Sequence, residues 1–368
     1  VAEDELLLNA GPHRFSVRLV EPRPGKRYET TVRAQAQVEV PEGETLDRVE
    51  FYLNDTRVAT LFQPPFVQPM LIPKGSQLAY VRSVAYLADG NSTEDLVPVN
   101  NDVERIDIQM VELYTTVADR HGRPVEGLTR DDFKVYEDGQ EQTVRRFEKV
   151  RDLPIHAGVL LDTSGSMSDK LDDAVKGALD FFKTVIKQRD RAAVITFSDK
   201  PNLLVRFTSD PAKLAAGVAG LQANGNTTLY DTIIYSLYYF GGIRGKRAVL
   251  LLTDGKDEGS RYPFADALDY ARRSGVAFYT IGIGLSTKDM DVRLKLEKLA
   301  DETGGRAFFV DRGNDLGKIY SLIETELRSQ YLVAYQSSRQ TRDDKFRSVE
   351  VKVSRSGLEA KTLRGYYP

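Results

Sequence analysis

The order of hydrophobic and polar residues changes along the chain, and the first change of pattern comes near residue 99. From about residue 14 to that point, short β-rich runs are separated by Pro and Gly, which is typical of an antiparallel sandwich. The run VRAQAQVEV alternates apolar and polar side chains, as a strand with one buried face does. In VEFYLNDTRVATL, the Asn54-Asp55 pair separates two strand-like runs and predicts a turn. We therefore expect a β-sandwich in residues 1–100.

Two further strand-rich pieces cover residues 101–152 and 330–368. In the first, the run DFKVYEDGQEQTVRRF contains an Asp138-Gly139 pair, which is the strongest short-range signal for a hairpin. In the second, valines alternate with polar residues over residues 349–353, as in a strand. Neither piece has enough strands to bury a face by itself. We therefore expect the two pieces to fold together as one split β-sandwich.

Residues 153–329 alternate apolar strand patterns with amphipathic helix patterns. The strand patterns are AGVLLD, RAAVITF, RAVLLLTD, VAFYTIGIG and RAFFV. Apolar residues keep helical spacing in the stretches 171–186, 229–240 and 316–327. This alternation predicts a doubly wound α/β domain, with a mostly parallel sheet and helices on both faces. Ligands of such sheets bind beyond the carboxyl ends of the strands, so the residues after AGVLLD and RAVLLLTD are the first candidates for a site.

Composition narrows the classes of function. The chain has 368 residues, which favours several domains. Its 51 basic and 54 acidic residues leave a net charge of −3, so it lacks the basic surface that nucleic-acid binding requires. The absence of cysteine excludes thiol catalysis, disulfides and thiolate metal sites. No apolar run approaches the roughly 20 residues of a membrane helix. The start at Val1 indicates a preceding segment, which could be an export signal, another domain or a tag.

The loop after AGVLLD carries the first candidate chemistry. Asp162, Ser164 and Ser166 alternate in the sequence DTSGS, so a tight turn can aim one carboxylate and two hydroxyls at one point. Hard oxygen donors of this kind suit Mg²⁺, Mn²⁺ or Ca²⁺ and do not suit zinc or copper. The positive end of a helix that we expect to start near Ser168 would point at the same place. The same residues are also those of an ordinary helix N-cap, so this loop alone does not decide between the two readings.

Two other segments favour the metal site over the helix cap. GNTTLYDTI places Thr227 at a loop-to-helix junction, and LLLTDGKD places Asp254 directly after a buried strand. Both positions lie where a ligand site of a doubly wound sheet is expected.

The ordered set DTSGS, GNTTLYD and TDG resembles the metal-ion-dependent adhesion site (MIDAS) of von Willebrand factor A domains. The resemblance implies that Asp162, Ser164, Ser166, Thr227 and Asp254 hold the metal, that a partner's Asp or Glu fills an open coordination position, and that the domain covers residues 153–329. The family often has GGT where this chain has GNT, so Thr228 is the alternative ligand to Thr227.

The flanking segments extend the resemblance. ADRHGRPVEGLTRDDFKVYEDGQEQTVRRF before the domain, and SQYLVAYQ, KFRSVEVKV and LRGYYP after it, resemble a bacterial family related to von Willebrand factor A. The first region resembles a bacterial immunoglobulin-like module. The expected fold is thus a doubly wound von Willebrand factor A domain in residues 153–329, inserted in a split β-sandwich formed by 101–152 and 330–368, and preceded by an immunoglobulin-like β-sandwich in 1–100.

These expectations favour cation-dependent protein binding or adhesion, by a secreted, cell-surface or periplasmic bacterial protein with Mg²⁺, or Mn²⁺ or Ca²⁺, as cofactor. The alternative is a structural protein that assembles with its own copies, in which the acidic ligand comes from a neighbouring protomer. An enzyme that uses the cation as a Lewis acid would need a general base beside it. The sequence indicates no such base, because His13, His121 and His156 are scattered. We therefore expect a binding protein and not an enzyme.

Overall fold

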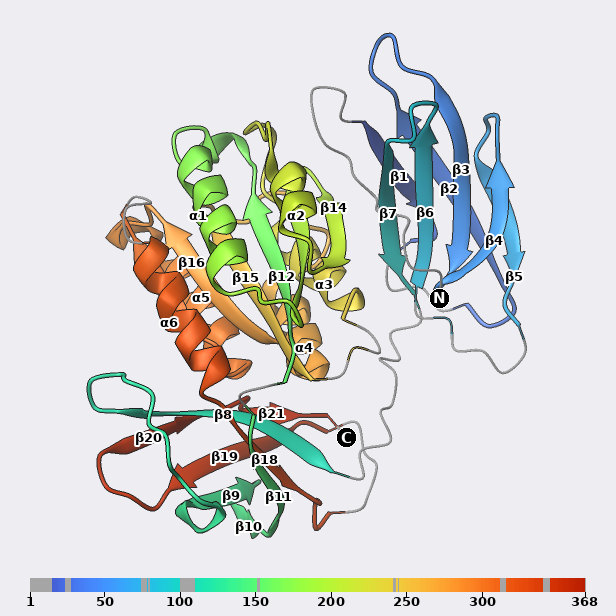
Figure 1. The fold of residues 1–368 in the computed structure, drawn as a ribbon. Helices are drawn as coiled ribbons and strands as arrows, with labels where there is room; N and C mark the ends of the chain where they lie inside the picture. Colours follow the sequence, from blue (N-terminus) through green and yellow to red (C-terminus); the bar gives the residue numbers. More distant parts are fainter. Residues whose placement is uncertain are drawn as a thin grey trace.

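The computed structural model describes most of the chain and is shown as a ribbon in Figure 1. The described residues are 15–23, 28–73, 78, 80–99, 110–150, 153–240, 243, 245–311, 316–339 and 345–367. They form an N-terminal group of strands, a central α/β region, and a second group of strands that both precedes and follows the α/β region in the sequence.

A six-stranded sheet forms the centre of the α/β region, in the order β14-β13-β12-β15-β16-β17. Neighbouring strands pair in parallel from β13 through β17, and only β14 is antiparallel to its neighbour. The strands are β12 (Ile155–Asp162), β13 (Arg191–Phe197), β14 (Pro201–Thr208), β15 (Lys246–Thr253), β16 (Ala277–Ile283) and β17 (Ala307–Val310). The mostly parallel sheet agrees with the sequence pattern, which did not indicate β14. Pro201 begins this edge strand, a position where a missing backbone N–H disturbs no central pairing.

Helices cover both faces of this sheet. They are α1 (Leu171–Thr184), α2 (Pro211–Val218), α3 (Leu229–Tyr238), α4 (Phe264–Ser274), α5 (Met290–Glu302) and α6 (Leu316–Arg328). Leu250 and Leu252 of β15 belong to the core with α1, α2 and α6, whereas Val249 and Leu251 belong to the core with α3, α4 and α5. Because successive side chains of a strand point to opposite faces, a strand buried on both faces must be apolar throughout.

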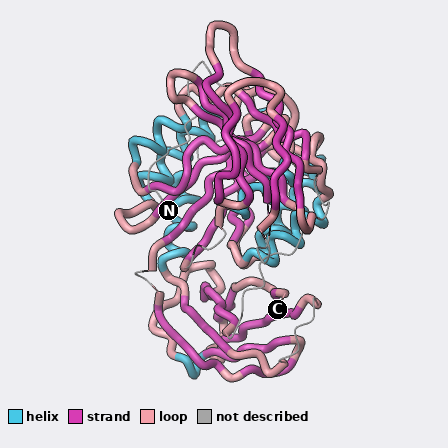
Figure 2. The backbone as a smooth tube through the Cα atoms, turned by 90° about the vertical axis from the view of Figure 1, so that its right-hand side faces the viewer, coloured by secondary structure: helices cyan, strands magenta, loops and turns pink. Residues whose placement is uncertain are grey.

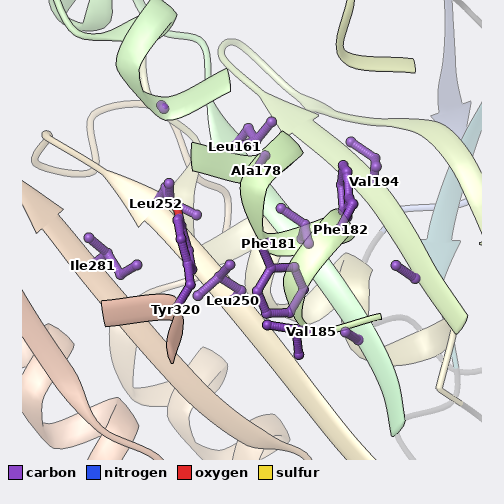
Figure 3. Close-up of a cluster of buried hydrophobic side chains, with 14 of the residues drawn as sticks. Leu161, Ala178, Phe181, Phe182, Val185, Val194, Leu250, Leu252, Ile281 and Tyr320 are labelled. Atoms are coloured by element: carbon purple, nitrogen blue, oxygen red, sulfur yellow. The ribbon is translucent and has the colours of Figure 1, made fainter. Parts of the chain in front are cut away.

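Figure 3 shows the first of these two cores. Phe181 and Phe182 of α1 lie beside Tyr320 of α6, and the Phe181 and Tyr320 rings meet edge to face with centroids 5.7 Å apart. This packing fixes α1, which follows the DTSGS loop, against the sheet. The helix begins at Leu171, not near Ser168 as the sequence suggested, because the loop first makes a short 3₁₀ turn at Gly165–Met167.

The N-terminal strands form two antiparallel sheets, in the orders β1-β2-β5 and β4-β3-β6-β7. Their bounds are β1 (Ser16–Glu21), β2 (Thr31–Glu39), β3 (Leu46–Leu53), β4 (Thr56–Leu61), β5 (Val67–Leu71), β6 (Tyr80–Leu87) and β7 (Ser92–Pro98). One apolar core joins the sheets, with Val49, Phe51 and Val81 fully buried. The turn between β3 and β4 contains Asn54 at a φ of 51°, a left-handed conformation that Asn tolerates.

The strands on either side of the α/β region pair with each other. They are β8 (Val111–Asp119), β9 (Phe133–Glu137), β10 (Gln140–Gln142), β11 (Val144–Lys149), β18 (Tyr331–Tyr335), β19 (Arg347–Val353), β20 (Leu358–Lys361) and β21 (Gly365–Tyr366). The sheet orders are β10-β9-β19-β21 and β11-β18-β8-β20, so β18 lies between two strands that precede the α/β region. In Figure 2 these sheets form the lower part of the molecule, below the helices.

The N-terminal sheets also pack against the α/β region. Val84 and Leu96 share a buried cluster with residues of α3. Arg206 of β14 reaches the carboxylate of Glu94 on β7, with an Nη2 to Oε2 distance of 2.8 Å. Lys200, in the connection between β13 and β14, donates a hydrogen bond of 2.6 Å to the carbonyl of Val17. The contact between the two regions is therefore both apolar and charged.

Candidate metal centre

Three loops meet at the carboxyl ends of β12 and β15. The DTSGS loop follows β12, the TDG loop follows β15, and the GNTT loop precedes α3. Backbone hydrogen bonds join the first and third of these: Gly165 N donates to Gly225 O at 2.9 Å, and Asn224 N donates to Thr163 O at 2.8 Å. Since β12 and β15 are neighbours in the sheet, their loops are brought together from segments far apart in the sequence.

Asp162 is the buried end of β12, with no exposed surface. Its Oδ1 accepts a hydrogen bond of 2.9 Å from the backbone N–H of Ser164, and its Oδ2 accepts one of 2.5 Å from the hydroxyl of Thr253. Burial raises the pKa of Asp162 to about 6, and the nearby charge of Asp254 acts in the same direction. A nearby cation would stabilise the ionised form of this carboxyl.

Ser164, Ser166 and Asp254 form a continuous chain of polar contacts. The Ser166 hydroxyl donates to Oδ1 of Asp254 at 2.8 Å, and the Ser164 and Ser166 hydroxyl oxygens are 3.1 Å apart. The side chain of Asp254 is only 1% exposed. The structure thus brings these residues of two different loops into direct contact.

The surroundings of Gly255 bring the hydroxyl of Thr227 close to the carboxylate of Asp162 and the hydroxyl of Ser166. A Cβ atom added to Gly255 would lie 3.3 Å from Oγ1 of Thr227, 3.7 Å from Oδ2 of Asp162 and 3.7 Å from Oγ of Ser166. Three candidate oxygens, from the DTSGS and GNTT loops, therefore lie around a position of the TDG loop that any larger side chain would fill. All five residues predicted from the sequence lie together at this point, whereas their role as ligands stays a prediction.

The structure also distinguishes Thr227 from Thr228. The backbone N–H and the hydroxyl of Thr228 both donate to the carbonyl of Ser198, each at 2.9 Å. The Thr228 side chain is therefore used to anchor the loop, while the Thr227 hydroxyl lies on the side of Gly255. This geometry favours Thr227 as the ligand.

Sequence reasoning missed several residues that shape the site. Lys170 places its Nζ 2.5 Å from Oδ2 of Asp254 and 3.3 Å from the carbonyl of Ser166. No local signal indicated the contact with Asp254, because the two residues are 84 positions apart in the sequence. The sequence did not single out this lysine, which the structure places beside two of the candidate ligands.

Other carboxylates hold the loops around the candidate centre in place. Asp199 Oδ1 accepts a hydrogen bond of 2.8 Å from Asn226 N, and Asp257 Oδ1 accepts one of 3.2 Å from Tyr230 N at the start of α3. Asp231 accepts hydrogen bonds from Arg261 N and Nε at 2.8 and 2.9 Å, which ties the chain after the TDG loop to α3. The sequence did not indicate these contacts, because the partners are distant from one another along the chain.

Within the part of the chain that the structure describes, His, Cys, Asp and Glu side chains form no group of three or more suited to a metal ion. The candidate centre has two carboxylates and depends on hydroxyl oxygens for the rest of its donors. In that same part of the chain, no helix is both long and apolar enough to cross a membrane.

Comparison with known proteins identifies the α/β region. Residues 158–322 match the family model of the von Willebrand factor type A domain, so the chain contains such a domain, as the sequence motifs indicated. Human integrin alpha-X is 28% identical over 163 residues, which are 41% of this chain and 14% of the integrin. The chain thus matches only a small part of that relative.

Two solved structures give further similarities. The von Willebrand factor domain of the type V pili tip protein Mfa5 from Porphyromonas gingivalis is 14% identical, with 47% of this chain and 94% of that chain covered and a TM-score of 0.42. Proximal thread matrix protein 1 from the mussel byssus, with a zinc-occupied MIDAS motif, is 19% identical, with coverages of 52% and 50% and a TM-score of 0.43.

Proposed function

We propose that Asp162, Ser164, Ser166, Thr227 and Asp254 hold one divalent cation, through which the domain binds an acidic residue of a protein partner. Mg²⁺ is the proposed ion, with Mn²⁺ and Ca²⁺ as the alternatives. The observation that carries this proposal is the convergence of oxygens from the DTSGS and GNTT loops around Gly255 of the TDG loop. That convergence is independent of the sequence motif, because it depends on which strands are neighbours.

The donors present fit a hard divalent ion. Carboxylate and hydroxyl oxygens are its preferred ligands, and the candidate centre offers them without nitrogen or sulfur. A divalent cation bound there would be neutralised by Asp162 and Asp254 and would still attract a third carboxylate. The chain's own residues supply the rigidity: Thr253 and the N–H of Ser164 orient Asp162, and Ser198 holds the Thr227 loop through Thr228.

The proposal is one of binding and not of catalysis. Lys170 is the basic side chain beside the candidate ligands, and its ammonium group is paired with Asp254 at 2.5 Å. A lysine side chain that is held by a carboxylate and a backbone carbonyl is not positioned as a general base. We further propose that the protein acts at a bacterial cell surface, in the periplasm or in secreted form, because strand-rich modules accompany the von Willebrand factor type A domain on both sides.

Calorimetric titration with Mn²⁺ tests the cation site. The unaltered protein should bind one ion, and Asp162→Ala should abolish binding while circular dichroism shows an intact fold. Asp266→Asn is the matched control, because Asp266 is exposed on α4 and carries the same charge. Undiminished Mn²⁺ binding by a folded Asp162→Ala protein would contradict the proposal.

A pull-down from the native source tests the partner. Capture in Mg²⁺ that is lost in excess chelator, and lost again in Asp254→Lys, supports metal-dependent recognition of a partner. Light scattering of the purified protein with and without chelator tests the alternative, in which the acidic residue comes from a second copy of this chain. Capture of the same partner with equal yield in chelator would show that the cation is not part of the interface.

A further inference from the structure

Lys170 occupies a defined position at the edge of the candidate metal centre. Its Nζ is 2.5 Å from Oδ2 of Asp254 and 3.3 Å from the carbonyl oxygen of Ser166, and its side chain is 25% exposed. Asp169 is a much weaker partner, since its Oδ1 is 3.8 Å away and its side chain is 74% exposed. The main electrostatic partner of Lys170 is therefore a candidate ligand of the cation.

Gly284 packs against the Lys170 side chain. A Cβ atom on Gly284, which follows β16 with a φ of +70°, would lie 3.1 Å from Cε of Lys170 and 3.7 Å from its Nζ. The backbone N–H of Gly284 is bonded to Val310 O at 2.7 Å, so this loop is held in place. The aliphatic part of Lys170 thus passes through a narrow space whose width depends on a glycine.

We propose that Lys170 is a built-in competitor of the cation, which lowers the affinity of the centre by sharing the carboxylate of Asp254. This inference rests on the proposed function and adds a regulating residue to it. Two carboxylates alone would offer the cation a charge of −2, and the ammonium reduces this to −1. The cation must also bind a few ångströms from a like charge, in surroundings where Coulomb forces are weakly screened.

The same lysine keeps the centre assembled. The carboxylates of Asp162 and Asp254 are like charges in one site and repel each other. The ammonium of Lys170 offsets the negative charge of Asp254, so the loops keep their arrangement at low cation concentration. Lys170 therefore lowers the affinity of the centre for the cation and also keeps the loops in their binding arrangement. The cation binds only when its concentration is high enough to overcome the competing charge.

Isothermal titration with Mn²⁺ in the full chain tests this inference. The proteins compared are the unaltered chain, Lys170→Met, Lys170→Gln and the control Lys176→Met, which removes an exposed lysine from the same helix. We expect both Lys170 variants to bind Mn²⁺ about tenfold more tightly than the unaltered chain, a gain of about 1.4 kcal/mol. We expect Lys176→Met to bind as the unaltered chain does, within about twofold, because exposed charges are screened.

Thermal denaturation gives a second readout. The Lys170 variants should melt at a lower temperature than the unaltered chain in chelator, and Mn²⁺ should raise their melting temperature by more. If Lys170→Met is unfolded in chelator, Lys170→Gln takes its place in the titration. The amide of this variant can still make a polar contact.

Three results are distinguishable. Equal or weaker Mn²⁺ binding by the folded Lys170 variants overturns the competitor role and leaves the proposed function intact. An equal gain in Lys176→Met also overturns it, because the effect would then be one of net charge. Failure of the unaltered chain and all variants to bind Mn²⁺ removes the proposed function, and the inference with it.

Discussion

The hydroxyl of Thr253 donates a hydrogen bond of 2.5 Å to Oδ2 of Asp162, across the pair of adjacent strands β15 and β12. Thr253 has no exposed surface, and its Oγ1 also accepts a hydrogen bond of 3.2 Å from Gly255 N. One hydroxyl thereby orients the buried carboxylate and the start of the TDG loop together. Thr253 is not itself one of the proposed ligands.

Replacing this hydroxyl should weaken the centre without removing a ligand. We expect Thr253→Val to lower the stability of the protein by about 1 to 2 kcal/mol, because a buried acceptor of Asp162 loses its partner. Mn²⁺ affinity should also fall by about tenfold, since 1.4 kcal/mol corresponds to that factor. Urea denaturation and calorimetry measure the two effects. Thr253→Ser keeps the hydroxyl and serves as the control, and equal loss in both variants would contradict the role of the hydrogen bond.

The raised pKa of Asp162 predicts how stability depends on pH. Burial raises this pKa from 3.8 to about 6, so between these values the folded protein holds a proton that the unfolded chain releases. Folding stability in chelator should therefore fall as the pH rises from about 4 to about 6, by up to roughly 3 kcal/mol from this group. Cation binding should show the opposite dependence and weaken below about pH 6, because the cation needs the ionised carboxylate.

Asp162→Asn separates this contribution from the other titrating groups. Urea denaturation in chelator measures the stability of both proteins from pH 4 to pH 7. The stability of the unaltered protein relative to the variant should fall as the pH rises through this range. Parallel profiles would show that Asp162 does not titrate there.

The contacts of Glu94 indicate that the N-terminal strands and the von Willebrand factor type A domain stabilise each other. Its side chain is fully buried and pairs with Arg82 Nη1 at 2.9 Å and Arg206 Nη2 at 2.8 Å, from the two sides of the contact. The hydroxyl of Tyr239 also bonds to it. We expect Glu94→Ala to destabilise the protein by roughly 3 to 5 kcal/mol, because it leaves the buried guanidinium of Arg82 without its carboxylate partner.

The measurement is urea denaturation, with Glu42→Ala as the control. Glu42 is exposed and carries the same charge. A loss of less than about 1 kcal/mol in Glu94→Ala would mean that water replaces the carboxylate at this contact.

We propose that residues 101–152 and 330–368 form one domain, and truncation after Gln330 tests this. β18 pairs with β11 on one side and with β8 on the other, so its removal leaves two separate edges. Backbone amides of β8 and β11 should lose protection against hydrogen exchange in the truncated chain, because unpaired strands open readily. Unchanged exchange in these strands would contradict the proposal, and the amides of β2 and β3 serve as the internal control.

Local pattern was sufficient for the α/β fold and, together with the resemblance of three motifs to a known family, for the choice of candidate ligands. The apolar runs that end at Asp162 and Thr253 indicate buried strands, because a strand covered on both faces must be apolar at every position. Polar oxygens directly after such strands indicate a site, and the spacing in DTSGS is itself local. The same reasoning placed the start of α1 too early, because the 3₁₀ turn at Gly165–Met167 is a property of the folded loop.

Only the tertiary structure decided how the candidate residues meet. Lys170 and Asp254 are 84 positions apart, and Asp162 and Thr253 are 91 apart. Their contacts exist because β12 and β15 are neighbours in the sheet, and strand order depends on the packing of the whole domain. The same arrangement places the Thr228 hydroxyl against the carbonyl of Ser198. It also places the oxygens of Asp162, Ser166 and Thr227 around Gly255. Hydrophobic periodicity reports which face of a segment is buried, but it carries no information about which other segment covers that face.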